Sequence, residues 1–90
     1  MKQSRSRSLT IQRSIVPLSE RKKYMTRLRA RKAYYQGANC TFCVFEEADL
    51  AGAFIEFIEA DDPAVLAKAL QEAPESLVDA SRIYQEVELD

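Results

Sequence analysis

The chain's two cysteines are its most conspicuous candidates for chemistry. Cys40 and Cys43 form a C-x-x-C pair within the stretch NCTFCVFEE, residues 39–47. A thioredoxin-type pair lies where a strand meets a helix N-terminus, which lowers the pKa of the first thiol. Here the surrounding residues are aromatic and β-branched, which predicts a strand, and strand side chains three residues apart point to opposite faces. We therefore expect two free thiols that neither form a disulfide with each other nor share a metal ion.

The residue types that the chain lacks exclude several kinds of catalysis. The sequence contains no histidine and no tryptophan. Without an imidazole, Ser-His-Asp and Cys-His mechanisms are excluded, as is a histidine ligand for haem or zinc. Two cysteines alone do not complete a four-ligand zinc site within one chain. We expect no metal and no cofactor, and the sequence identifies no catalytic residue.

Three polar residues interrupt apolar faces of the predicted strands and form the predicted ligand site. Arg13, Glu56 and Gln85 each lie between apolar residues that share their strand face. They form either a ligand-binding cluster, with Tyr24 and Tyr35 of the first helix lining the same cleft, or a purely structural ion pair with a hydrogen-bonded amide. Burying an unpaired charge costs several kcal/mol, so Arg13 and Glu56 should pair under either interpretation.

Hydrophobic periodicity and turn residues predict the elements that position these side chains. Ser19 is the expected N-cap of the first helix, and Gly37 suits the left-handed residue after its end. An aspartate before Pro63 is expected to cap the second helix, and Pro74 to stop it. The predicted order is strand 9–16, helix 20–36, strands 40–47 and 53–60 joined as a hairpin, helix 63–73 and strand 83–89.

This β-α-β-β-α-β order predicts an α+β fold. Right-handed crossovers arrange such a chain as a four-stranded antiparallel sheet of order 4-1-3-2 with both helices on one face, the ferredoxin-like arrangement. Ninety residues are enough for one domain of this kind. We therefore expect a flexible basic N-terminal arm at residues 1–8 and a single domain at residues 9–90.

With this topology the chain resembles the dimeric α+β barrel superfamily, and more narrowly its small antibiotic-biosynthesis-monooxygenase-like proteins. The likeness covers about residues 9–89 and rests on PLSERKKYMTRLRARKAYYQGA after a strand, then TFCVFEEADLAGAFIEFIEADDPAVLAKAL. It implies sheets paired face to face in a dimer, and a ligand cleft between the sheet and the helices of each protomer. The haem-degrading members use an axial histidine and the oxygenases often a tryptophan and an asparagine, whereas here only Asn39 is present, without a matching motif.

Two functions follow from these observations. The first is a small-molecule-binding domain of the dimeric α+β barrel type, with cofactor-free oxygenation of an unknown substrate as its enzymatic form. The alternative is a non-enzymatic module that binds a protein or an anion through the basic first helix. Residues 1–36 hold eleven of the 13 basic residues, and residues 37–90 hold 13 of the 14 acidic ones. The first helix carries Arg21, Lys22, Lys23, Arg27, Arg29, Arg31 and Lys32, which we expect on its solvated outer face.

Nucleic acid and membrane are not expected as partners. An RNA-recognition motif shares the order of elements, but AFIEF, residues 53–57, lacks the preceding basic residue, glycine and aromatic, and Glu56 and Glu59 repel phosphate. No apolar run approaches the ~20 residues that span a bilayer. The basic N-terminus lacks the apolar segment of a signal peptide, so we expect a cytoplasmic protein.

Apolar residues on both faces of the hairpin strands predict a homodimer. Phe42 and Val44 lie on one face of the second strand and Phe45 on the other. Two helices cover only one face, and monomeric proteins rarely expose the other as a contiguous apolar patch. An isologous dimer hides both copies of that face. The interface or its rim is expected to include Thr10, Gln12, Ser14, Tyr84, Glu86 and Glu88.

Overall fold

The computed structural model describes residues 7–75 and 82–89. Residues 1–6 of the predicted N-terminal arm lie outside the described residues, whereas Ser8 already belongs to the first strand. The elements are β1 (Ser8–Ile15), the 3-10 turn η1 (Leu18–Glu20), α1 (Arg21–Gly37), β2 (Thr41–Glu46), β3 (Ala53–Ala60), α2 (Pro63–Gln71) and β4 (Tyr84–Gln85).

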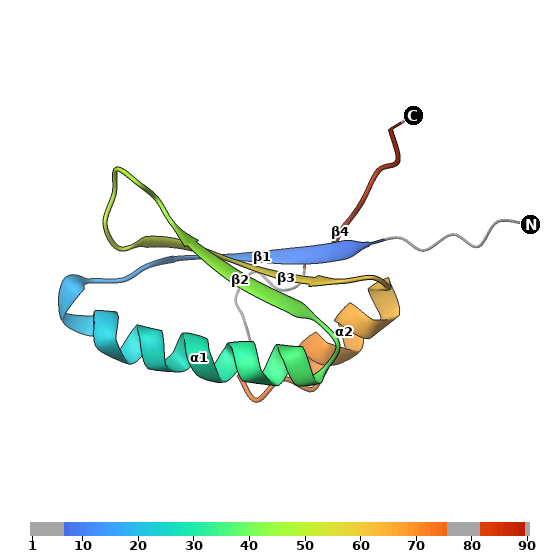
Figure 1. Cartoon of the computed structure of the whole chain (residues 1–90), viewed down its shortest axis with the longest axis horizontal. Coiled ribbons are helices and arrows are strands. Elements are labelled where there is room, and N and C mark those ends of the chain that lie inside the picture. Colours follow the sequence, from blue (N-terminus) through green and yellow to red (C-terminus); the bar gives the residue numbers. More distant parts are fainter. Residues whose placement is uncertain (1–6, 76–81, 90) are drawn as a thin grey trace, which may run out of the picture.

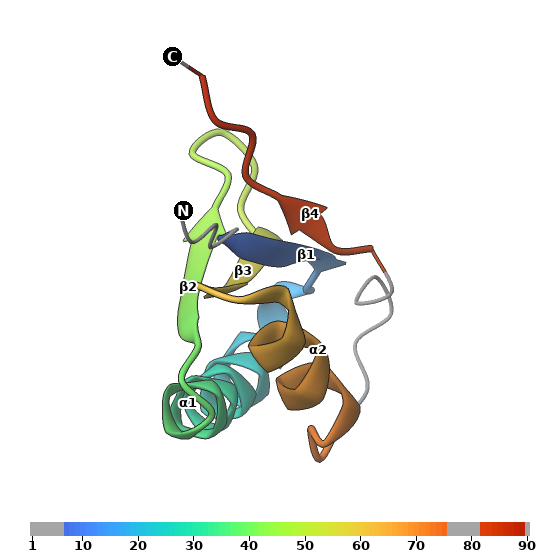
Figure 2. The ribbon, with the colours of Figure 1, turned by 90° about the vertical axis from the view of Figure 1, so that its right-hand side faces the viewer.

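The four strands form one antiparallel sheet in the order β2-β3-β1-β4, which reads 4-1-3-2 from the β4 edge. Both helices lie on the same side of this sheet (Figures 1 and 2). The chain is therefore an α+β protein with a four-stranded antiparallel sheet and two helices, an architecture compatible with the ferredoxin-like arrangement. Within the part of the chain described, no helix is long and apolar enough to cross a membrane.

The last strand is much shorter than the predicted strand at 83–89. Tyr84 pairs with Leu9 and Gln85 with Ser8, and the Glu86 N–H donates to the Arg7 carbonyl at 2.8 Å. Pairing stops there because β1 begins at Ser8, so the partner strand has ended. Residues 86–89 are exposed and run away from the sheet on the side opposite the helices (Figure 1).

The side of the sheet that the helices do not cover, called the open face below, carries the apolar side chains of β1. Thr10, Gln12 and Ser14 lie on the helix-covered side, where Thr10 and Gln12 are buried, so their predicted place on the open face is wrong. The Thr10 hydroxyl is satisfied there, since it donates to the Arg82 carbonyl at 2.7 Å. Strand alternation and register place on the open face Leu9, Ile11, Arg13, Ile15, Thr41, Cys43, Phe45, Ala53, Ile55, Phe57, Glu59 and Tyr84.

The helix boundaries follow the predicted signals only in part. Asp62 caps α2 as expected, because its carboxylate accepts the Ala64 N–H at 2.7 Å, and α2 ends before Pro74. Ser19 is not the N-cap of α1, since it lies inside η1 and α1 begins at Arg21 without a side-chain cap. Gly37 is the last residue of α1, and the left-handed residue is Asn39, with φ 65°.

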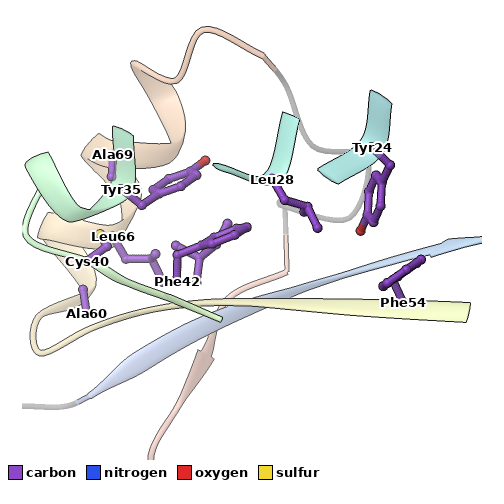
Figure 3. Packing of buried hydrophobic residues seen from close by; sticks show 10 residues of the cluster. Tyr24, Leu28, Tyr35, Cys40, Phe42, Phe54, Ala60, Leu66 and Ala69 are labelled. Carbon is purple, nitrogen blue, oxygen red and sulfur yellow. The ribbon is translucent and has the colours of Figure 1, made fainter. Parts of the chain in front are cut away.

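The core lies between the helices and the covered side of the sheet (Figure 3). Tyr24, Leu28 and Tyr35 form the buried stripe of α1, at the spacing expected for one helix face. The Tyr24 ring packs 4.7 Å from that of Phe54, and the Tyr35 ring stacks 5.9 Å from that of Phe42. The remaining buried apolar residues are Cys40, Ile58, Ala60, Leu66 and Ala69.

Candidate functional site

A fully buried carboxylate lies at the centre of the candidate site. Glu56 is 0% exposed and projects from the middle of β3 beneath α1. Its Oε2 accepts a hydrogen bond from the Tyr24 hydroxyl at 2.7 Å. Its Oε1 lies 2.8 Å from Nη1 of Arg31, and Oε2 lies 2.9 Å from the same nitrogen. The charge is therefore buried, paired and hydrogen-bonded, the condition under which burial is tolerated.

Arg31 connects this buried carboxylate to a more exposed one. The Arg31 side chain is only 11% exposed, and Nη1 is used for Glu56. Its Nη2 and Nε donate to Oε1 of Glu75 at 2.6 and 3.1 Å. Glu75 follows α2 and its side chain is 44% exposed. One edge of the guanidinium is thus fixed in the core, and the other faces a carboxylate that solvent reaches.

The cationic partner of Glu56 is Arg31 and not the predicted Arg13. Arg13 and Glu56 do not pair, because Arg13 is opposite Ile55 on the open face while Glu56 is opposite Gln12 on the covered side. Arg31 was expected on the outer face of the first helix, which is also wrong. The signal was present in the sequence: position 31 lies three residues after Leu28, on the stripe of buried residues.

Gln85 is also separate from this cluster. It pairs with Ser8, whereas Glu56 pairs with Gln12, four residues further along β1. At about 3.3 Å per residue that separation is roughly 13 Å. Of the five predicted site residues, the structure brings together Tyr24 and Glu56, and places Tyr35 beside the cavity described next.

A cavity of about 290 Å³ opens next to the outer edge of Arg31. It lies between α1 and the segment that follows α2. Tyr34 and Tyr35 contribute aromatic rings, which meet edge to face at 4.8 Å. Its lining residues are Arg27, Ala30, Arg31, Tyr34, Tyr35, Ala73, Pro74 and Glu75. This combination of apolar wall and a few convergent polar groups is typical of a small-molecule site.

The surroundings of Arg31, Glu75 and the two tyrosines shift the pKa of each of these groups. Burial lowers the pKa of Arg31, but its contacts with Glu75 and Glu56 outweigh burial and leave that pKa raised. The hydrogen bond from Arg31 lowers the pKa of Glu75. Burial, and then the hydrogen bond to Glu56, raises the pKa of Tyr24, and burial raises the pKa of Tyr35 to about 12. The tyrosines are therefore neutral and Arg31 is charged.

The two cysteines are separate from this site and from each other. Both are free thiols, Cys40 buried on the helix side and Cys43 exposed on the open face, as the strand pattern predicted. Burial raises the pKa of the Cys40 thiol, the opposite of what an activated cysteine needs. Among residues 7–75 and 82–89, no group of three or more acidic or cysteine side chains is placed to hold a metal ion.

The cluster is equipped for binding rather than for nucleophilic attack. The Tyr24 hydroxyl is occupied by Glu56, while the outer edge of Arg31 can hold a carboxylate, as its contact with Glu75 illustrates. Comparisons with family models, with curated proteins and with solved structures found no match to this chain.

Proposed function

We propose that the protein is a small-molecule-binding domain of the dimeric α+β barrel type, with the ferredoxin-like topology and a cytoplasmic location, where Cys40 and Cys43 remain thiols. The ligand class is a small aromatic acid that enters the cavity between α1 and residues 73–75. Cofactor-free oxygenation of such a ligand is the enzymatic form of this proposal.

The observation that carries this proposal is that the two edges of the Arg31 guanidinium have different partners, Glu56 in the core and Glu75 at the cavity. Glu56 and the surrounding core fix the guanidinium, so its outer edge is preorganised toward the cavity. Glu75 occupies that edge with a single carboxylate oxygen. A ligand carboxylate would replace Glu75 in a bidentate contact, and its ring would pack against Tyr34 and Tyr35.

The homodimer part of the proposal is supported by the open face. Phe45 is 57% exposed and Ile15 is 78% exposed, and both lie on that face. Between them, Ile55 and Phe57 of β3 continue the apolar surface. Packing two such faces about a two-fold axis would remove this surface from water in both copies.

A thermal-shift screen with small aromatic carboxylates, starting from benzoate, tests the ligand site. A ligand at 100 times its dissociation constant stabilises by ~2.7 kcal/mol, which raises Tm by roughly 10 °C or more. Glu75→Gln removes the competing carboxylate and should tighten binding several-fold. The matched control is Glu72→Gln, which removes a nearby exposed charge that does not contact Arg31. The proposal fails if no compound stabilises the protein, or if both variants bind equally.

A second function is favoured by the outer face of α1. Lys22, Lys23, Arg29 and Lys32 are all exposed along it. This row of cations suits a polyanion or an acidic protein surface. Stabilisation by heparin but by no small carboxylate in the same screen would favour this module over the ligand-binding domain.

A further inference from the structure

The open face ends in an apolar hollow at the β2–β3 hairpin. This hollow, of about 570 Å³, has an apolar wall that includes Ile15, Phe45, Leu50 and Ile55. Its charged lining residues are Arg13, Glu46 and Glu47, of which Glu46 is paired with Arg21. The remaining lining residues are Ser14, Ala53 and Phe54. Arg13 is exposed and makes no ion pair with any residue in 7–75 or 82–89. An unpaired cation beside apolar side chains is a recognition feature, because it selects an occupant that carries both an acid and apolar groups.

The C-terminal segment 86–89 has this composition. Val87 is 73% exposed and Leu89 is 90% exposed, and they alternate with Glu86 and Glu88. Glu86 lies 3.4 Å from Arg7, whereas Glu88 makes no ion pair with any described residue. The segment therefore presents an unpaired acid and two apolar side chains that its own molecule leaves uncovered.

The segment cannot reach the hollow of its own molecule. Gln85 pairs with Ser8, and Arg13 is five residues further along β1, roughly 17 Å away at about 3.3 Å per residue. Because β4 runs antiparallel to β1, residues 86–89 continue past Ser8 and lead away from Arg13 (Figure 1). If residues 86–89 occupy such a hollow, it is therefore the hollow of another molecule.

Two-fold symmetry brings the two features together. The hairpin and the C-terminal segment project from opposite ends of the sheet, both on the open-face side (Figures 1 and 2). If two open faces pack about an axis that runs across the strands, the hairpin end of each copy lies over the β4 end of the other. An axis along the strands would instead place hairpin over hairpin and β4 over β4, so that no C-terminal segment would lie near a hairpin hollow.

We propose that residues 86–89 of each copy dock into the hairpin hollow of a second copy, with Glu88 paired to Arg13 and Val87 and Leu89 against Phe45 and Leu50. The contact occurs twice in the dimer, because an isologous interface repeats every contact. This exchange of C-terminal segments rests on the homodimer proposed above, to which it adds a defined orientation and a defined pair of charges.

Charge reversal tests the proposed pair by sedimentation equilibrium at micromolar concentrations. Arg13→Glu and Glu88→Arg should each raise the dimer dissociation constant at least about tenfold, and the double variant should recover most of the affinity. Lys68→Glu is the matched control, since it makes the same charge change at an exposed position of α2 and should leave dimerisation unchanged. Circular dichroism verifies that each variant is folded.

A cross-linking experiment measures the contact independently of affinity. In a Cys43→Ser background, Leu50→Cys combined with Leu89→Cys should give a disulfide-linked dimer on mild oxidation. A monomeric wild-type protein would overturn both the homodimer and the segment exchange. A wild-type dimer that neither charge reversal weakens, or that forms no cross-link, would overturn the exchange alone.

Discussion

At the scale of single residues, the contact between Glu56 and Arg31 decides how the core tolerates charge. Glu56 is fully buried and its only cationic partner among the described residues is Arg31. On the covered side of the sheet, the neighbour of Glu56 in β1 is Gln12, another buried polar residue. The pair explains why a glutamate is accommodated between Phe54 and Ile58.

Arg31→Met is therefore expected to destabilise the protein by about 3–5 kcal/mol, because it leaves a buried carboxylate without its cation. Urea unfolding monitored by circular dichroism measures the change. The double variant Arg31→Met/Glu56→Leu should recover most of this loss, since an apolar pair of similar volume replaces the buried ions. A single variant within ~0.5 kcal/mol of wild type would contradict the assigned role of Arg31.

At the scale of elements, one glycine in the β2–β3 turn continues the pairing of β3 with β1 beyond the end of the strand. Gly52 has φ +92°, a conformation that side chains rarely adopt. Its carbonyl accepts the Val16 N–H at 2.8 Å, and a Cβ on Gly52 would lie 2.5 Å from the Val16 carbonyl oxygen. Glu46 also accepts the Gly52 N–H at 2.8 Å and pairs with Arg21, so the turn is linked to the start of α1.

Gly52→Ala should destabilise the fold by more than about 1–2 kcal/mol, since the left-handed conformation alone costs that much and a backbone clash is added. Gly37→Ala is the matched control, because open space surrounds that position at the end of α1. It should be neutral or stabilise by about 0.4–1 kcal/mol. Chemical denaturation measures the free energy of unfolding of both variants. Equal values would show that the left-handed conformation of Gly52 does not contribute to stability.

At the scale of the whole molecule, Cys43 reports on whether the open face is covered. Its thiol is exposed in the single chain, whereas Cys40 is buried under the helices. A dimer through the open face would shield Cys43 and leave the environment of Cys40 unchanged.

Thiol labelling with mass-spectrometric assignment should therefore show a Cys43 rate that falls as protein concentration rises, and a Cys40 rate that becomes measurable only on unfolding. Arg13→Glu should restore fast labelling of Cys43 at high concentration. A Cys43 rate independent of concentration would exclude the open face as the dimer interface. Rapid labelling of both cysteines would overturn the structural interpretation of the C-x-x-C pair.

Local spacing was sufficient to predict most of the elements. The hairpin, the Asp62 cap of α2 and the opposite faces of the two cysteines all depend on neighbours within a few positions. The length of β4 was not predictable in this way. Its pairing ends where β1 begins, which is a property of the partner strand rather than of residues 83–89.

The candidate site was likewise predictable where it depends on local spacing and unpredictable where it depends on tertiary packing. The sequence by itself determined that Glu56 interrupts an apolar strand face and that Tyr24, Leu28 and Tyr35 share a helix face, because periods of 2.0 and 3.6 fix which side chains point together. Only the tertiary structure decided which face of β1 the helices cover. Alternation states which residues share a face, but burying Thr10 and Gln12 depends on partners contributed by other segments, such as the Arg82 carbonyl. That choice placed Arg13 on the open face and left Arg31 to neutralise Glu56.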